Sequence, residues 1–217
     1  MKRRTLDVIV SVGGLVLAGL LLIVGLVLTS NANFARTYVH DQLAAQKISF
    51  KTADTLTAEE KQQACLVQYA GQPLTSGAQA ECYANNFINV HLQGIAGGKT
   101  YAELGDVQTQ LKAQIADAQK TNAPNLADLQ KQLADTNTNR ETVFKGETLR
   151  GLLLTSFGFS QFGEKAAQAA TVAYLASGLL LILALLGIIH AVRTPRTTAF
   201  AAPETADRRS DRQTVGV

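Results

Sequence analysis

The chain has 217 residues, of which 20 are Lys or Arg and 17 are Asp or Glu, giving a net charge of +3. Hydrophobic residues make up 47% of it, but two long apolar blocks enclose a polar middle, which excludes a uniform soluble domain. The length allows one modest domain or two. The 17 glycines and two cysteines exclude a collagen-like chain and a disulfide-dense mini-protein.

The first apolar block begins near the N-terminus. No charged residue occurs between Val8 and Ala35, and the most apolar run, which ends at Leu28, would measure about 31 Å as a helix. This length matches a membrane core, so we predict a transmembrane helix at residues 8–29. The alternative is a cleaved secretory signal with a cleavage site at residues 30–32, although signal cores are shorter, at about 7 to 15 residues.

The second apolar block is uncharged from Ala166 to Val192 and predicts a transmembrane helix at residues 169–192. Lys and Arg residues flanking membrane helices stay on the cytoplasmic side. Such residues lie before the first block and after the second, namely Lys2, Arg3, Arg4, Arg193 and Arg196. We therefore expect a plasma-membrane protein with residues 1–7 and 193–217 in the cytoplasm and residues 30–168 outside.

The C-terminal tail, residues 193–217, holds five arginines and little that could be buried. Such a composition predicts disorder. The arginines are suited to the anionic head groups of membrane lipid. Because no aromatic platform accompanies them, we expect no binding of nucleic acid.

The middle segment opens with a continuation of the first membrane helix for about two to three turns, followed by a short extended piece around Ile48 and Phe50. Three capping boxes then place a hydroxyl three residues before Glu or Gln. They begin at Thr57, Ser76 and Thr100. The first two start helices predicted at about 58–70 and 77–95, which Gly-containing turns stop, so these helices form a hairpin.

The two cysteines suit this hairpin. Cys65 lies six residues before Gly71 and Cys82 six residues after Ser76, so two antiparallel helices would bring them level. In an oxidising compartment this predicts a Cys65–Cys82 disulfide, worth about 3 kcal/mol through closure of the loop. The alternatives are two buried free thiols or a metal-binding pair, for which no further Cys or clustered His is present.

A second hairpin is predicted from Tyr101 onward, where apolar residues recur every three or four positions. The break at Asn122–Asn125 separates this helix from a far arm that we expect to fray or loop at residues 135–142. Residues 148–163 are apolar, interrupted by glycines and too short to cross a bilayer. They predict an interfacial helix or a bent elbow on the outer leaflet.

Small residues recur four positions apart within the predicted spans. These pairs are Gly14 with Ala18 and Gly187 with Ala191. Small residues let helices approach closely, so the pairs predict packing of one span on the other or on a partner, the alternative being lipid exposure. Neither span contains a charged residue, which argues against proton relays and coupled transport.

The sequence offers little for catalysis. Its three histidines, His40, His91 and His190, lie far apart and outside any metal-binding pattern such as HExxH. We therefore predict no catalytic residue, no cofactor and no metal site.

Three strings, Tyr38–Ile48, Tyr83–Leu92 and Phe144–Leu154, resemble a group of actinobacterial two-span membrane proteins of unknown function. The likeness covers most of residues 1–192. Members of the group often carry the label aromatic-ring-opening dioxygenase. That chemistry uses ferrous iron held by two His and one carboxylate, and this sequence presents no such triad, so we expect no enzymatic activity.

Together these patterns predict an all-α protein, with two transmembrane helices flanking an extracytoplasmic domain of helical hairpins. We expect a non-enzymatic scaffold or accessory subunit of a cell-envelope complex that binds an envelope protein partner, or forms a homo-oligomer, through the outer helices. One alternative is a sensor module that signals through a separate subunit, because the tail is too short for an output domain. Another is an oligomeric pore.

Overall fold

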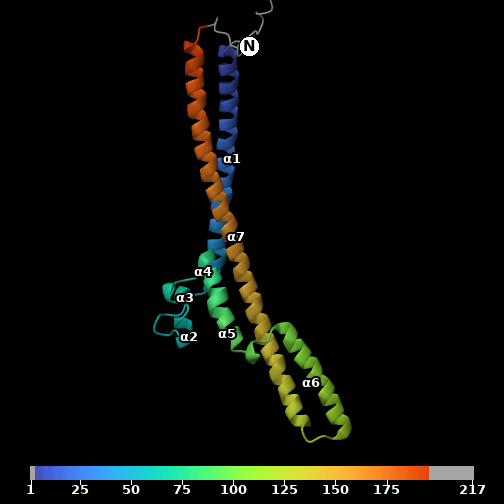
Figure 1. Ribbon diagram of the computed structural model, residues 1–217. Helices are drawn as coiled ribbons and strands as arrows, with labels where there is room; N and C mark the ends of the chain where they lie inside the picture. Colours follow the sequence, from blue (N-terminus) through green and yellow to red (C-terminus); the bar gives the residue numbers. More distant parts are fainter. Residues whose placement is uncertain (1–2, 196–217) are drawn as a thin grey trace, which may run out of the picture. The chain divides into compact units, whose positions relative to one another are not determined.

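The computed structural model describes residues 3–195, and over this range every regular element is a helix apart from one isolated bridge between Ser49 and Pro73. The prediction of an all-α protein is confirmed. The helices are shown in Figure 1 and are α1 (Arg3–Ala45), α2 (Ala58–Lys61), α3 (Ala64–Gln68), α4 (Gly77–Cys82), the π-helix η1 (Tyr83–Ile88), α5 (Asn89–Gln93), the 3₁₀ helix η2 (Ala96–Gly98), α6 (Tyr101–Thr121) and α7 (Leu126–Arg193). The predicted disorder of the tail concerns residues that lie, from 196 onward, outside the described range.

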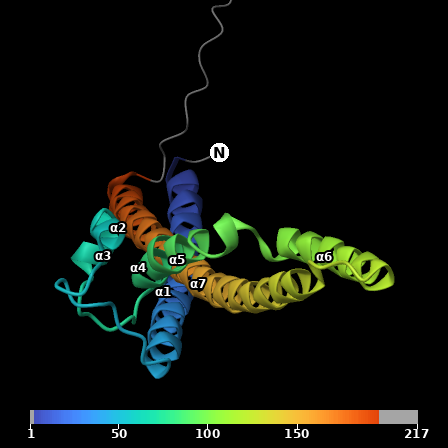
Figure 2. The same cartoon turned by 90° about the horizontal axis from the view of Figure 1, so that it is seen from below.

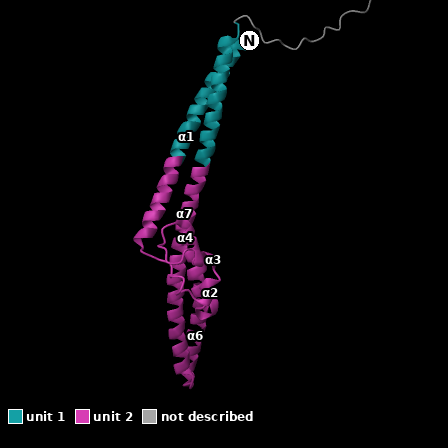
Figure 3. Cartoon of the chain, turned by 90° about the vertical axis from the view of Figure 1, so that its left-hand side faces the viewer, with its two compact units in different colours: residues 1–28, 169–217 teal, residues 29–168 magenta. Residues whose placement is uncertain are grey.

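The chain divides into two compact units, coloured separately in Figure 3. Unit 1 consists of residues 1–28 and 169–217, and unit 2 of residues 29–168. The long helices α1 and α7 each contribute residues to both units.

Both long helices contain a stretch that is long and apolar enough to cross a membrane. Only 17% of the most apolar window of each helix is buried, whereas a core helix of a soluble protein would be mostly buried. The exposed side chains in these windows are large and aliphatic, as in Ile23 of α1 and Ile182 of α7. Such a surface is suited to lipid.

Each of α1 and α7 contains a series of buried residues that recur at intervals of seven. In α1 the series is Ser11, Ala18, Gly25, Ala32 and Val39, and in α7 it is Gly163, Ala170, Ser177, Ala184 and Ala191. A seven-residue repeat keeps one face of a helix turned toward its neighbour, as in left-handed coiled coils. Nine of these ten residues are Gly, Ala or Ser, so the two backbones can approach closely.

Unit 2 has its main core where α4, η1 and α5 pack with the last turns of α1 and with the stretch of α7 that contains Val143 and Leu153. The core side chains include Leu43, Phe50, Leu66, Leu74 and Leu153. The predicted extended piece is present as the Ser49–Pro73 bridge, beside which Phe50 N–H donates to the Gln72 carbonyl at 2.9 Å.

The first hairpin follows its prediction with one difference. All three capping boxes are formed, and the second helix runs from Gly77 to Gln93 through the π-helical turn η1. The helix predicted at 58–70 is instead interrupted at Gln63, where the backbone is extended. The burial of Glu60 and Leu66, each 1% exposed, explains the break. In one continuous helix these two residues, six positions apart, would face different sides. The interruption allows both side chains to be buried.

The second hairpin corrects the prediction of a frayed far arm. Helix α6 ends at Asn122, which adopts a left-handed conformation, and α7 then passes through residues 135–142 without interruption. Figure 2 shows α6 lying beside the first turns of α7. Contacts across the hairpin hold this polar stretch helical, since Gln108 donates to Asn137 at 2.6 Å and Arg140 to the Tyr101 carbonyl at 3.3 Å.

No bent elbow is found at residues 148–163, which are helical within α7. The glycines there do not break the helix. At Gly163 the missing side chain makes room for α1, since a Cβ atom would lie 2.8 Å from the Cβ of Ala35. Leu153 in the same segment is buried in the core of unit 2.

Candidate functional site

The two cysteines join α3 to α4, with Cys65 and Cys82 bonded as a disulfide and their Cα atoms 6.0 Å apart. Between them Gly71, at φ +74°, forms the turn that sends the chain back. The disulfide therefore links the two helices of the hairpin at the level that the sequence predicts.

The four small residues predicted to pack all lie on the face that α1 and α7 share within unit 1. A Cβ atom on Gly14 would be 3.5 Å from that of Ala184, and one on Gly187 would overlap the Ser11 hydroxyl. Ala18 is fully buried and its carbonyl accepts a 2.8 Å hydrogen bond from Ser177. Ala191 is buried as well. The four-residue spacing in the sequence did not indicate the longer repeat, in which buried small residues recur every seven positions.

A polar contact lies at one end of this face. The Nδ1 atom of His190 lies 2.9 Å from the carboxylate of Asp7, near the first turn of α1 and the last of α7. Both residues belong to unit 1, and their contact fixes the register of the two helices there.

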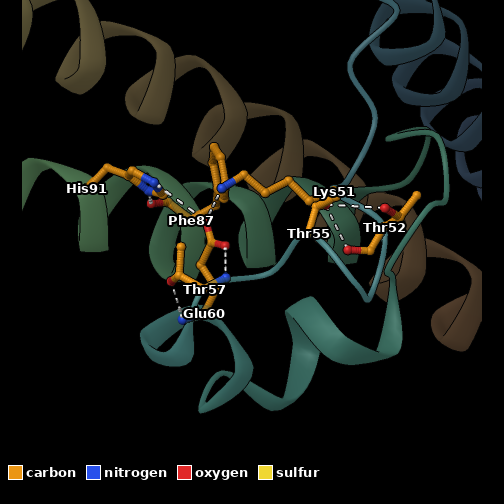
Figure 4. A network of polar contacts seen from close by, with 7 residues as sticks. All are labelled: Lys51, Thr52, Thr55, Thr57, Glu60, Phe87 and His91. Carbon is orange, nitrogen blue, oxygen red and sulfur yellow. Dashed lines mark hydrogen bonds and ion pairs between the residues drawn. The ribbon is translucent and has the colours of Figure 1, made fainter.

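A buried carboxylate is the centre of the polar network of unit 2 (Figure 4). Glu60 occupies the third position of α2, where it accepts a hydrogen bond from the Thr57 N–H at 2.8 Å. Lys51 Nζ donates to its other oxygen, also at 2.8 Å, and His91 Nε2 lies 3.5 Å away. The sequence indicated the cap but not these two partners, which come from the extended piece before α2 and from α5.

The protonation of Glu60 follows from these contacts. Burial by itself would raise the pKa of the carboxyl group, but hydrogen bonds from Lys51 and Thr57 and the charges of Lys51 and His91 outweigh it. The pKa of Glu60 is therefore below its ordinary value. At neutral pH the carboxylate is ionised and each of its two oxygens accepts a hydrogen bond, which is typical of a group with a structural role.

An aromatic column lies next to this carboxylate. The rings of Phe50, Tyr83, Phe87 and His91 follow one another at centroid distances of 5.3, 4.6 and 4.5 Å. The π-helical turn η1 contains two of them, and turns of this kind are frequent at functional sites. Burial, with a smaller contribution from the charge of Glu60, raises the pKa of Tyr83.

The histidines have separate partners. His40 lies beside Asp41, His91 beside Glu60 and His190 beside Asp7. Glu147, the acidic residue within the third resemblance string, pairs with Arg150. Across residues 3–195 no three His, Cys, Asp or Glu side chains are grouped so as to hold a metal ion.

Two surface features of unit 2 remain. The first is an apolar groove of ≈ 530 Å³ between α1 and α7, which we call the α1–α7 groove. Its lining residues are Tyr38, Val39, Gln42, Leu43, Gln46, Ile48, Leu149, Leu152, Leu153, Thr155, Ser156 and Phe159. None of them is charged, so the groove is suited to an apolar occupant.

The second feature, which we call the arm cluster, joins α6 to the first third of α7. The rings of Tyr101 and Phe144 are in contact, tilted by 48° with their centroids 5.5 Å apart, and the Arg140 guanidinium lies 3.9 Å from the centre of the Tyr101 ring. Gln108, Asn137 and Glu141 complete a shallow depression of ≈ 260 Å³ around them. The three central side chains come from segments about forty residues apart in the chain, which is why sequence patterns did not reveal the cluster.

Comparison of the chain with family models, with curated proteins and with solved structures found no match.

Proposed function

We propose that the chain is a non-enzymatic scaffold or accessory subunit of a cell-envelope complex. It is anchored by the apolar stretches of α1 and α7, with both termini in the cytoplasm, and it binds a partner protein through the arm cluster of unit 2. The basic residues at both ends of the chain and the disulfide support this orientation, since disulfides persist in oxidising compartments.

The observation that carries the proposal is the composition of the arm cluster. Tyr and Arg are the residues in which binding energy concentrates at protein interfaces, and apolar rings surround them there. Tyr101 is 40% exposed and Phe144 54% exposed, so both rings are available to a partner.

The arm cluster is also held in place before anything binds. Arg140 donates from Nε to the Tyr101 carbonyl at 3.3 Å and lies over the ring of the same residue. A side chain that is already ordered loses little conformational entropy on binding, which favours affinity.

The proposal is tested by photo-cross-linking in native membranes. A photoreactive phenylalanine analogue replaces Phe144 in the full chain, and the same analogue at Lys112, which is exposed on α6 away from the arm cluster, is the control. We expect one protein to be captured from Phe144 and not from Lys112, and the double variant Tyr101→Ala, Arg140→Ala to abolish the capture. Equal capture at both positions, or recovery of the chain alone, would overturn the proposal and favour a sensor or a pore.

A further inference from the structure

The arm cluster of unit 2 has a cation without a counter-ion at its centre. Arg140 is half-buried, and it takes part in none of the ion pairs formed among residues 3–195. Its contacts are the ring of Tyr101, the carbonyl of the same residue at 3.3 Å and the amide oxygen of Gln108 at 3.5 Å. All three groups are neutral, so no carboxylate compensates the positive charge.

The acidic residues nearby are already bonded to other groups. Glu141, which also lines the depression, forms an ion pair with Lys145 at 2.7 Å, one turn further along α7. On α6, the carboxylate of Glu103 accepts hydrogen bonds from the backbone and the hydroxyl of Thr100, both at 2.8 Å. The charge that remains at the depression is therefore that of Arg140.

The guanidinium group of Arg140 also has hydrogen-bond donors to spare. Nε donates to the Tyr101 carbonyl and Nη1 to Gln108, which accounts for two of its five N–H groups, and within residues 3–195 no acceptor is placed for the others. The side chain lines an open depression and is ordered by its contact with the Tyr101 ring. An ordered guanidinium group with free donors is suited to a carboxylate, which accepts two parallel N–H bonds.

A partner that covers the arm cluster takes this cation out of water. Desolvation of a guanidinium group without a counter-ion is strongly unfavourable, so a basic or wholly apolar surface would bind poorly here. An Asp or Glu offsets the desolvation through charge-assisted hydrogen bonds. Beside Arg140, the exposed rings of Tyr101 and Phe144 provide apolar surface for a neighbouring side chain of the partner.

We propose that the partner contacts the arm cluster through an acidic segment, in which an Asp or Glu pairs with Arg140 and an adjacent apolar side chain packs on Phe144. The segment belongs to the partner of the proposed function, on which this inference therefore rests. Charge complementarity selects the occupant, because the cation of the cluster lacks an anion and its aromatic rings lack a covering side chain.

The ion pair beside Arg140 offers a test that leaves the three central side chains in place. The full chain with the photoreactive analogue in place of Phe144 also carries either Glu141→Gln or Lys145→Gln, and the yield of captured protein is measured in native membranes. Removal of the negative charge strengthens the attraction of an acidic segment, and removal of the positive charge weakens it. We expect Glu141→Gln to raise the yield about twofold and Lys145→Gln to lower it about twofold. Both side chains are exposed and their pairing adds little to the stability of α7, so both variants fold.

A second measurement examines the partner directly. The captured protein is digested, and the peptide attached to the analogue is sequenced by mass spectrometry. We expect the residues within about one helical turn on either side of the attachment point to carry a net negative charge. Capture by the unsubstituted cluster should also fall at least about twofold when NaCl is raised from about 0.05 M to about 0.5 M, because salt screens exposed charges.

The outcomes separate this inference from the proposed function. Equal yields with Glu141→Gln and Lys145→Gln, changes of the opposite sign, or an attached peptide of net positive charge would each overturn the acidic segment. In all three cases a protein is still captured at the arm cluster, so the proposed function stands. Absence of capture at that position in the otherwise unsubstituted chain would overturn the proposed function itself, and the acidic segment with it.

Discussion

At the scale of single residues, Glu60 shows that a capping box, usually found at the surface, can be buried and hold segments of the core together. Its capping box is the same as that of Glu103, which accepts from the Thr100 N–H at 2.8 Å, yet Glu103 is exposed. The difference is the pair of basic partners, Lys51 and His91, which lie against Glu60 only because the hairpin folds back onto the extended piece. A capping box can be recognised in a sequence, whereas its burial depends on segments that meet only in the folded chain.

We expect Glu60→Gln to lower the free energy of unfolding by about 1–3 kcal/mol at pH 7, because it removes a charge-assisted hydrogen bond to Lys51. Thermal and denaturant unfolding of the full chain in detergent, followed by circular dichroism, measures the loss. Glu103→Gln is the matched control and should have a clearly smaller effect. A Glu103→Gln loss as large as that of Glu60→Gln would show that the cap alone matters.

The same variant has a pH signature. The pKa of Glu60 is lowered in the folded chain, so the carboxylate contributes its full stability at pH values above the ordinary value of 4.5. That contribution is lost as the pH falls from 4.5 through the lower folded value. We therefore expect the difference in stability between the unsubstituted chain and Glu60→Gln to be constant at neutral pH and to shrink below pH 4.5. A difference that persists undiminished in acid would contradict this role for the charge.

At the scale of elements, two glycines of α7 have different surroundings that the sequence alone does not reveal. Gly163 is buried against α1, where a Cβ atom would lie 2.8 Å from that of Ala35 and 3.4 Å from the Ala32 carbonyl oxygen. Gly151 has nothing within 4 Å of the same position. In the sequence both glycines interrupt an apolar run, which is why a bent elbow was predicted.

We expect Gly163→Ala to destabilise the chain by about 1–3 kcal/mol through overpacking against backbone that cannot easily move. Gly151→Ala, the matched control on the same helix, should instead stabilise it by about 0.5–1 kcal/mol, because alanine favours the helix and meets no neighbour. Unfolding in detergent by urea measures both changes. Two changes of the same sign would show that α7 does not contact α1 through Gly163.

The elements that could be predicted from the sequence are those whose signal is local. The capping boxes, the apolar stretches and the disulfide, whose cysteines are 17 positions apart, all depend on residues that are close in the chain, and each is present. The helical stretch at 135–142 was missed because its Asn and Thr residues favour loops, while Gln108 and Tyr101, which hold it, lie far away in the chain. The arm cluster and the α1–α7 groove were missed for the same reason.

At the scale of the whole molecule, the proposed function depends on the orientation that we expect across a membrane. Lys112 on α6 belongs to the unit that we expect outside the cell, and Arg193, the last residue of α7, to the end that we expect inside. In intact cells, Lys112→Cys should react with a membrane-impermeant maleimide and Arg193→Cys should react only after the cells are opened. The reverse pattern would place the disulfide in the cytoplasm and overturn the orientation.

The seven-residue spacing of the buried small residues in α1 and α7 also limits how the length of these helices can change. Inserting a single residue into either helix would rotate everything beyond it by about 100° and bring leucines and isoleucines onto the close-packed face. Insertions of seven residues, matched in both helices, would keep that face intact. In the membrane arrangement that we propose, the helices would therefore adapt to a thicker or thinner bilayer in steps of seven residues, and smaller mismatches would be met by tilting the helix pair.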